Sequence, residues 1–404
     1  MARWAEHFQD QFSWPPAPGP LPTQVMQNEP WAVSLEPPSE AEVRNASTAL
    51  NHFRASGPDS LSPALFKDGG EVLCKALTSL FECVWKEDSI PANWSESIIV
   101  AIYKKGSRTD CSNHRDISLT PVVTKLLASS IVRRLTAERE SWNREEQAGF
   151  RPGRGCIDHI FTLRQVLEQR HAYRRPTIAV FLDFKSAFNS VDRSIPFEIL
   201  ARKGVSMKYV NIIRALYSNT TGRVRVYGGL SDNFPTTRGV CHGCPISLFL
   251  LNFVVHSIME CSLAESHDVD VEVLPGERLV DLDYADDIVL LFDDVVTAQS
   301  TLNSLSKVVP LFSMHFAPSN CISNDRRIET DVSSRVAKAK AAYLNLRHLW
   351  RQKGISLRLK DRVYKERVRA VLLYGSETWP LRSEDLRRLQ VFHHRSLRSI
   401  AGVG

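Results

Sequence analysis

The sequence predicts an α+β fold, because short apolar runs typical of strands alternate with longer segments of helical periodicity. Residues 177–182 form an apolar run with β-branched side chains, which indicates a buried strand that ends at Asp183. Residues 279–284 and 288–292 are two further apolar runs around a short acidic turn, and together they predict a hairpin. Residues 209–217 predict a helix, since apolar side chains recur there at i, i+3, i+4, i+7 and i+8.

The first third of the chain predicts an extended arm followed by helices and one strand. Residues 13–38 contain eight prolines and predict an extended arm or linker. Ser39 is placed to cap a helix that continues to Leu50, and residues 73–84 have helical spacing. Residues 97–103 predict a buried strand that leads into a basic loop.

Four further segments complete the predicted elements. Residues 119–135 predict a helix with a basic end, and residues 224–227 a strand followed by a turn. The apolar stretch 245–259 contains Asn252 and His256, so we expect a buried helix there and no membrane partner. From residue 332 to residue 371 the pattern is helical and basic.

The composition is that of a soluble globular protein, and the distribution of charge favours a polyanionic partner. Apolar residues make up 43% and charged residues 24% of the 404 residues, as in an ordinary globular protein. Residues 326–404 carry 19 Lys and Arg against seven Asp and Glu, whereas the rest of the chain is slightly acidic. This asymmetry favours a polyanion held near the C-terminus, although a solvated helical face gives the same pattern.

The N-terminus and the cysteines indicate an intracellular protein. The first residues have no apolar signal core, and the eight cysteines are scattered, as is usual in a reducing compartment. Cys241 and Cys244 form a C-x-x-C pair without a second pair nearby, so we do not expect a zinc site. We therefore expect a location in the nucleus or cytoplasm, or both, and not secretion.

Three carboxylates at predicted strand ends are the main candidates for chemistry. Asp183 ends one strand, and Asp286 and Asp287 lie at the hairpin turn. If these elements are neighbours in one sheet, the carboxylates meet at one edge, where they could hold two Mg²⁺ ions, with Mn²⁺ as the alternative. An Asp after a strand and an Asp-Asp turn are also common without any function, so the spacing alone leaves both interpretations open.

The motifs around these residues resemble those of reverse transcriptases. Residues 181–188 (FLDFKSAF) resemble the first catalytic motif, and residues 284–291 (YADDIVLL) resemble the tyrosine-x-Asp-Asp motif. Residues 239–247 (GVCHGCPIS) are similar to the Gly-rich motif that precedes the template-contacting helix. Residues 113–120 and 147–155 are similar to finger motifs of non-LTR elements. Five motifs in the family's order are a strong signal.

By this resemblance the chain is identified as a non-LTR (LINE-type) retrotransposon reverse transcriptase, with the polymerase region and without the endonuclease domain. The resemblance implies a right-hand polymerase fold with fingers, a palm made of an antiparallel sheet backed by helices, and a reduced helical thumb. We expect a proline-rich arm and helix over residues 1–56, fingers and palm over 57–325, and a basic thumb-like region over 326–404.

The resemblance also implies the roles of individual residues at the metal site and the nucleotide site. Asp183, Asp286 and Asp287 would be the catalytic residues and would hold the metal ions together with the backbone carbonyl of Phe184. The residues expected to bind the nucleotide are Lys104, Arg115, Phe188 and His242, with Phe188 excluding a 2′-hydroxyl. The residues expected to contact nucleic acid are Arg151, Arg154, Gly239, Gly243 and Tyr284.

Four positions or segments depart from the family pattern. His242 occupies the place of a glutamine in the Gly-rich motif, and Asn189 that of an aspartate after Phe188. Asn320 replaces a lysine that can act as general acid toward pyrophosphate. After Cys321 the sequence has no recognisable primer-grip motif before the basic helices.

The function that we predict is RNA-directed DNA polymerisation, in which dNTPs are added to a DNA primer on an RNA template by a two-metal mechanism. The alternative is a catalytically impaired remnant that only binds nucleic acid, which His242, Asn320 and the lack of a recognisable primer-grip motif favour. The oligomeric state, the element of origin and the target site are not specified by the sequence.

Overall fold

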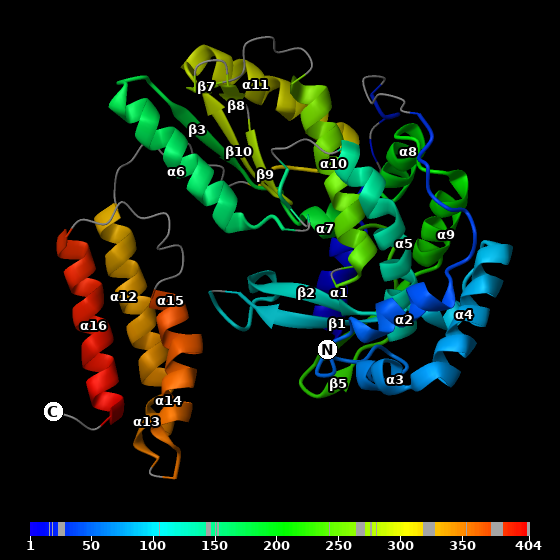
Figure 1. The fold of residues 1–404 in the computed structure, drawn as a ribbon, viewed down its shortest axis with the longest axis horizontal. Coiled ribbons are helices and arrows are strands. Elements are labelled where there is room, and N and C mark those ends of the chain that lie inside the picture. The colour runs from blue at the N-terminus through cyan, green and yellow to red at the C-terminus, as the bar shows by residue number, and fades with distance from the viewer. Residues whose placement is uncertain are drawn as a thin grey trace. The chain divides into compact units, whose positions relative to one another are not determined.

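The chain forms two compact units, a first unit that contains both helices and sheets and a second unit that is helical (Figure 1). The first unit comprises Met1–Cys156 and Tyr173–Ile322, and the second comprises Ile157–Ala172 and Ser323–Gly404. The predicted boundaries at residues 56 and 325 separate regions by the roles that we expect of them, and this division stays a prediction. A computed structural model describes residues 1–15, 17, 19–22, 29–104, 106–142, 147–149, 151, 153–241, 243–263, 271–274, 277–279, 281–317, 328–352, 354–372 and 383–401.

The larger sheet of the first unit has five strands and is mixed. Its order is β2-β1-β4-β5, and β6 pairs with β4. Strands β1 and β4 run parallel, whereas the other neighbours are antiparallel. The predicted strand over 97–103 is confirmed as β1. The strands are β1 (Glu96–Tyr103), β2 (His114–Leu119), β4 (Thr221–Val226), β5 (Gly229–Leu230) and β6 (Phe234–Pro235).

The smaller sheet has three antiparallel strands in the order β3-β10-β9. The predicted strand over 177–182 and the predicted hairpin are both confirmed. Val180, Leu182, Leu290 and Phe292 are buried, which fixes this sheet in the core. The strands are β3 (Ile178–Leu182), β9 (Asp281–Tyr284) and β10 (Asp287–Phe292), and a separate pair is formed by β7 (Val271–Leu274) and β8 (Glu277–Leu279).

Helix α10 (Pro245–Leu263) is the central helix of the first unit and packs against α5, α8 and α11. It is long and apolar enough to cross a membrane, but 83% of its most apolar window is buried inside the protein, as expected of a core helix. The predicted cap at Ser39 is confirmed by reciprocal bonds with Glu42. The other helices are α2 (Glu40–Thr48), α3 (Pro63–Asp68), α4 (Gly70–Glu87), α5 (Val122–Trp142), α7 (Ala187–Ser190), α8 (Ser194–Arg202), α9 (Met207–Tyr217) and α11 (Val295–Val308), with 3₁₀ turns at Ala92–Ser95, Cys111–Asn113 and Val309–Phe312.

The N-terminal segment contains a helix that the sequence analysis did not predict. Helix α1 (Ala2–Gln11) presents Trp4 and Phe8 to the five-stranded sheet, and Phe12 follows them into the same cluster. These side chains recur every four residues, which is a helical pattern. The segment before the proline-rich arm is therefore part of the first unit.

The second unit is helical and has its own small core. Its buried side chains include Ala339, Trp350, Tyr364, Val368 and Leu389. The predicted helical pattern over 332–371 is confirmed. The helices are α6 (Cys156–Ala172), α12 (Ile328–Asn345), α13 (Arg347–Arg351), α14 (Leu357–Val363), a π-helical turn (Tyr364–Arg369), α15 (Ala370–Leu372) and α16 (Ser383–Ala401).

Candidate active site

Strand pairing brings the three predicted carboxylates to one end of the smaller sheet. Leu182, the last residue of β3, pairs with Ile288 of β10. Asp183 follows Leu182, and Asp287 precedes Ile288, so in an antiparallel pair the two lie side by side. Asp286 lies in the turn of the hairpin, which is possible because Ala285 adopts a left-handed conformation with φ of 61°.

The electrostatics of Asp287 show that the three carboxylates interact. The pKa of Asp287 is raised by burial first, and then by the negative charges of Asp286 and Asp183. The positive charge of Arg115 opposes this shift but does not cancel it. Three carboxylates in this position repel one another, and a bound divalent cation would relieve that repulsion.

The donor atoms at this sheet end fit a hard divalent cation. Carboxylate and carbonyl oxygens are the ligands that such ions prefer. The described residues contain no group of three or more His, Cys, Asp or Glu side chains already close enough to hold a metal. The carboxylates thus match a cation in charge and chemistry, and their side chains would have to converge on it.

The backbone of Phe184 lies next to Asp183 in a short β-bridge. Phe184 pairs with Phe316, and their rings stack with centroids 5.4 Å apart. The two hydrogen bonds of this bridge are made by its neighbours: Lys185 donates to the His315 carbonyl (2.8 Å), and Ala317 donates to the Asp183 carbonyl (2.8 Å). The carbonyl of Phe184 is therefore not used in this bridge and can serve as a ligand.

The N-terminal segment also reaches this region, which the sequence analysis missed. The ring of Trp14 stacks on His315 with centroids 5.4 Å apart. The ammonium group of Lys185 lies 5.4 Å from the centre of the same Trp14 ring. A lone Trp inside a proline-rich stretch gives no sequence signal for such a contact.

Residues Gln147–Gly149 pack against the hairpin that carries Asp286 and Asp287. The Ala148 amide donates to the Asp283 carbonyl (2.9 Å), and the Gly149 carbonyl accepts from the side chain of Asn252 on α10 (2.8 Å). A Cβ atom on Gly149 would lie 2.2 Å from the amide nitrogen of Ala285. Only glycine therefore allows the backbone to approach the acidic turn so closely.

Phe188 and Gly239, the first glycine of the Gly-rich motif, lie against each other. Phe188 lies on α7 and is buried, and its carbonyl accepts from the Val240 amide (2.7 Å). Gly239 has φ of 74°, and a Cβ there would lie 2.8 Å from the backbone of Phe188 and Asn189. Gly243 has φ of 111° and approaches the Ser118 carbonyl of β2. These two glycines serve close backbone contacts, and their predicted contact with nucleic acid stays a prediction.

The predicted cationic residues lie at the ends of β1 and β2. Arg115 is exposed on β2 and pairs with Ile102, and its charge acts on Asp287. Lys104 is exposed just after β1, and its amide donates to the Asn113 carbonyl (2.8 Å). Tyr284, at the end of β9, is half-buried. The structure thus brings Arg115 near the carboxylates and leaves the roles of Lys104 and Tyr284 as predictions.

Arg151 is held in an ion pair, which the sequence did not predict. Its guanidinium donates to Glu140 (2.7 Å) and to the Gln147 carbonyl (3.0 Å), and its side chain is 8% exposed. Burial alone would raise the pKa of Glu140, but the pairs with Arg139 and Arg151 outweigh it and lower that pKa. This favours a structural role for Arg151, whereas Arg154 is exposed. His242 and Asn320 lie outside the described residues, and so does the segment directly after Cys321 in which we recognise no primer-grip motif.

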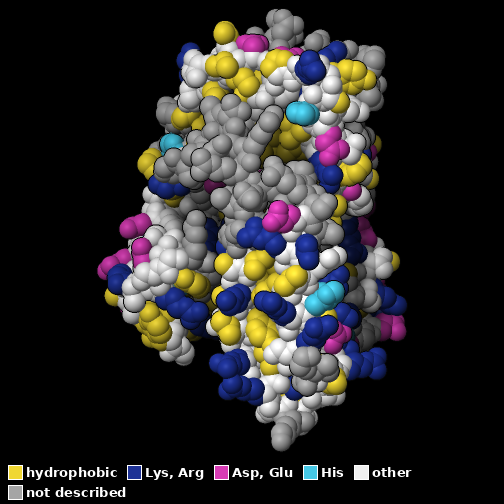
Figure 2. All heavy atoms as spheres, turned by 90° about the vertical axis from the view of Figure 1, so that its left-hand side faces the viewer, with side chains coloured by type: hydrophobic (Ala, Val, Ile, Leu, Met, Phe, Trp, Pro, Cys, Tyr) yellow, Lys and Arg dark blue, Asp and Glu magenta, His cyan; other side chains and the backbone are white. Residues whose placement is uncertain are grey.

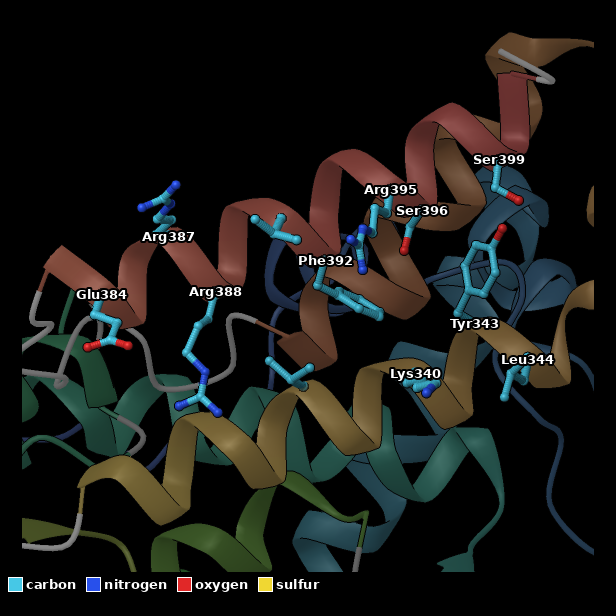
Figure 3. Close-up of a pocket in the computed structure, with 12 residues that line it drawn as sticks. Lys340, Tyr343, Leu344, Glu384, Arg387, Arg388, Phe392, Arg395, Ser396 and Ser399 are labelled. Carbon is cyan, nitrogen blue, oxygen red and sulfur yellow. The ribbon is translucent and has the colours of Figure 1, made fainter. Parts of the chain in front are cut away.

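The second unit has a basic groove between α12 and α16, with a volume of about 1100 Å³. Figure 2 shows Lys and Arg side chains gathered around hydrophobic ones on the face of these helices. Figure 3 shows Lys340 and Tyr343 of α12 opposite Arg388, Phe392 and Arg395 of α16. One carboxylate, Glu384, lies at its rim among the cations. Cations interleaved with aromatic rings are typical of nucleic-acid contacts.

Comparison with known proteins places this site in a recognised domain. Residues 102–321 match the family described as reverse transcriptase (RNA-dependent DNA polymerase). The chain is 28% identical, over 56% of its length, to the Retrovirus-related Pol polyprotein from type-1 retrotransposable element R2 of Popillia japonica. It is 22% identical, over 94% of its length, to the probable RNA-directed DNA polymerase from transposon X-element of Drosophila melanogaster. It is 25% identical, over 63% of its length, to the transposon TX1 uncharacterized 149 kDa protein of Xenopus laevis.

The chain spans only part of each of these relatives. It covers 19% of the Xenopus protein, 31% of the Popillia protein and 45% of the X-element protein. The matched region contains the smaller sheet, the Gly-rich motif and both finger-like motifs.

Proposed function

Because the chain belongs to the reverse transcriptase family, among the polymerases of non-LTR retrotransposons, we propose that it adds dNTPs to a DNA primer on an RNA template. The observation that supports this most is that Asp183, Asp286 and Asp287 lie at the same end of the smaller sheet, where their charges interact. The repulsion among these three carboxylates is unfavourable, and binding of nucleic acid alone gives no reason for it.

Two divalent ions, which we propose to be Mg²⁺, would lower the pKa of the attacking 3′-hydroxyl and stabilise the leaving pyrophosphate. Asp183 and Asp286 would hold both ions, with Asp287 and the Phe184 carbonyl completing the ligands. Arg115 is exposed on β2 and its charge acts on Asp287. It would neutralise charge on the triphosphate, and Lys104 would do the same from the end of β1. Phe188 would lie under the sugar and exclude a 2′-hydroxyl.

The proposed subdomains follow the right-hand polymerase fold. Residues 57–175 would form the fingers, residues 176–325 the palm and residues 326–404 a reduced thumb. The three-stranded antiparallel sheet with α10 and α11 fits the palm. The groove between α12 and α16 would contact the phosphates of the template or primer. We place the protein inside the cell, in the nucleus, the cytoplasm or both.

Primer extension tests this function directly. The protein is incubated with a DNA primer on a heteropolymeric RNA template, dNTPs and Mg²⁺, and extension is followed on a gel. We expect slow but template-directed extension, which Asp286→Asn should abolish. The control is Asp232→Asn, which removes an exposed carboxylate from the loop between β5 and β6. Extension that survives in Asp286→Asn, or no extension by any of these proteins with Mg²⁺ or Mn²⁺, would contradict the proposal.

A further inference from the structure

A cluster of polar side chains around Asn189, the residue after Phe188, joins three segments of the first unit. The side-chain amide of Asn189 on α7 donates to Asp116 of β2 (2.9 Å) and to Gln11 of α1 (3.2 Å). Asn189 is 3% exposed and Asp116 is 5% exposed, so water contributes little to their solvation. A bond of this kind to a buried carboxylate is charge-assisted and stronger than one between neutral groups.

The chemistry of Asp116 determines which residue can stand at position 189. An ionised carboxylate only accepts hydrogen bonds, so the NH₂ group of Asn189 must face it. The other amide atom of Asn189, Oδ1, is buried and has no hydrogen-bond partner among the described residues. At this position asparagine therefore acts through its NH₂ donor and not through its oxygen. An aspartate at 189 would place two buried carboxylates in contact.

The same cluster holds the backbone on which Phe188 lies. The Asn189 amide nitrogen donates to the Ser186 carbonyl (2.8 Å), closing the turn after the first catalytic motif. The Cα of Asn189 also forms the surface against which Gly239 packs. Asp116 directly follows Arg115, whose charge acts on Asp287. The bond between Asn189 and Asp116 thus ties the Phe188 turn and the Gly-rich loop to the strand that carries Arg115.

We propose that Asn189 and Asp116 are a matched pair of positioning residues that orient the Phe188 turn toward the incoming nucleotide. This inference rests on the proposed polymerase function. It means that Asn189, which departs from the aspartate usual in the family, is compensated by Asp116 within the same protein. Gln11 supports the pair from α1, so the N-terminal helix contributes to the nucleotide site.

A swap of the two residues tests the pair. Wild type, Asn189→Asp, Asp116→Asn and the double variant are compared in single-dNTP incorporation. Asn189→Asp should raise the KM for dNTP about tenfold with a smaller change in kcat, a coupling of the size expected for contacting residues. It should also weaken discrimination against ribonucleotides, because Phe188 is displaced. The double variant has the amide and carboxylate exchanged, so it should return KM and discrimination to near the wild-type values.

A second Asn–Asp pair in the same unit is the matched control. Asn211 on α9 faces Asp88 at 3.5 Å, so Asn211→Asp also creates two neighbouring carboxylates. We expect this variant to leave KM and ribonucleotide discrimination unchanged. The proposal is overturned if Asn189→Asp resembles wild type, if the double variant fails to recover, or if only the unfolding temperatures change.

Nucleotide binding separates failure of this pair from failure of the proposed function. Binding of a fluorescent dNTP to the protein–primer–template complex is measured for the same four proteins. If wild type binds the dNTP but does not extend the primer, the polymerase proposal fails. The pair is still supported in that case if Asn189→Asp is the only one of the four proteins that binds the dNTP weakly. Equal binding by all four proteins would overturn the pair.

Discussion

Gly149→Ala should disable the site without touching a catalytic side chain. Gly149 lies directly against the hairpin turn that carries Asp286. An added Cβ would be 2.2 Å from the Ala285 nitrogen and 2.9 Å from the Ala285 Cα. The neighbours of Gly149 hold it in place. Its amide donates to the Gln147 side chain (2.7 Å), and its carbonyl accepts from Asn252 on the central helix (2.8 Å). The hairpin turn is therefore the part that has to move.

The size of the movement follows from the contact distances. Cβ atoms essentially never come closer than 3.0 Å to another heavy atom, so the turn has to shift by about 0.8 Å or more. Asp286 follows Ala285 and would move with it. A misplacement of about 1 Å at a reacting centre can cost about 100-fold in rate. Overpacking of this kind also destabilises the fold by about 1–3 kcal/mol.

Steady-state incorporation of one dNTP on a defined RNA template measures this loss. We expect kcat/KM of Gly149→Ala to fall about 100-fold, with the unfolding temperature lowered by only a few degrees. Gly19→Ala is the control, because a Cβ there meets nothing within 4 Å. A Gly149→Ala enzyme within about threefold of wild type would contradict this prediction, because the turn would then tolerate the shift.

Three further predictions concern charge and the departures from the family. The pKa of Asp287 is raised in the folded state, so its ionised form costs stability at neutral pH and that stability returns as the pH falls through the folded pKa. Asp287→Asn should therefore raise the unfolding temperature at neutral pH without divalent ions while abolishing extension; a lower temperature would argue against repulsion at the site. The double variant Arg388→Ala and Arg395→Ala should reduce the slope of log binding constant against log salt concentration by the amount expected for about two phosphate contacts. An unchanged slope would show that the groove does not bind nucleic acid. Asn320→Lys combined with His242→Gln should raise extension by about 100-fold or more if those positions are limiting, and no gain would show that they are not.

The sequence predicts the parts of this fold whose signals are local. The strand before Asp183 and the hairpin around Asp286 are short apolar runs next to polar turns, and each forms as expected. Ser39 and Glu42 form a capping box, which depends on residues three apart. Helix α1 also has a local signal, because Trp4 and Phe8 recur at helical spacing.

The contacts that complete the candidate site depend on residues far apart in the chain. Gly149 approaches Ala285 across more than 130 residues, and no spacing rule indicates such a contact. Arg151 was expected to face the template from its position among glycines, whereas the structure pairs it with Glu140. Asn189 departs from the family pattern, and its partner Asp116 lies 73 residues away in the sequence. Side-chain pairing of this kind follows from tertiary packing and cannot be inferred from one segment.

We propose that Asp183 and the hairpin carboxylates hold the divalent ions jointly. The most direct measurement is a titration of the protein–primer–template–dNTP complex with Mn²⁺, followed by electron paramagnetic resonance. We predict two bound ions in the wild-type protein, coupled to each other, and loss of that coupled signal in Asp183→Asn. If Asp183→Asn binds Mn²⁺ with the same stoichiometry and spectrum as wild type, the carboxylates do not share the ions and the account is contradicted.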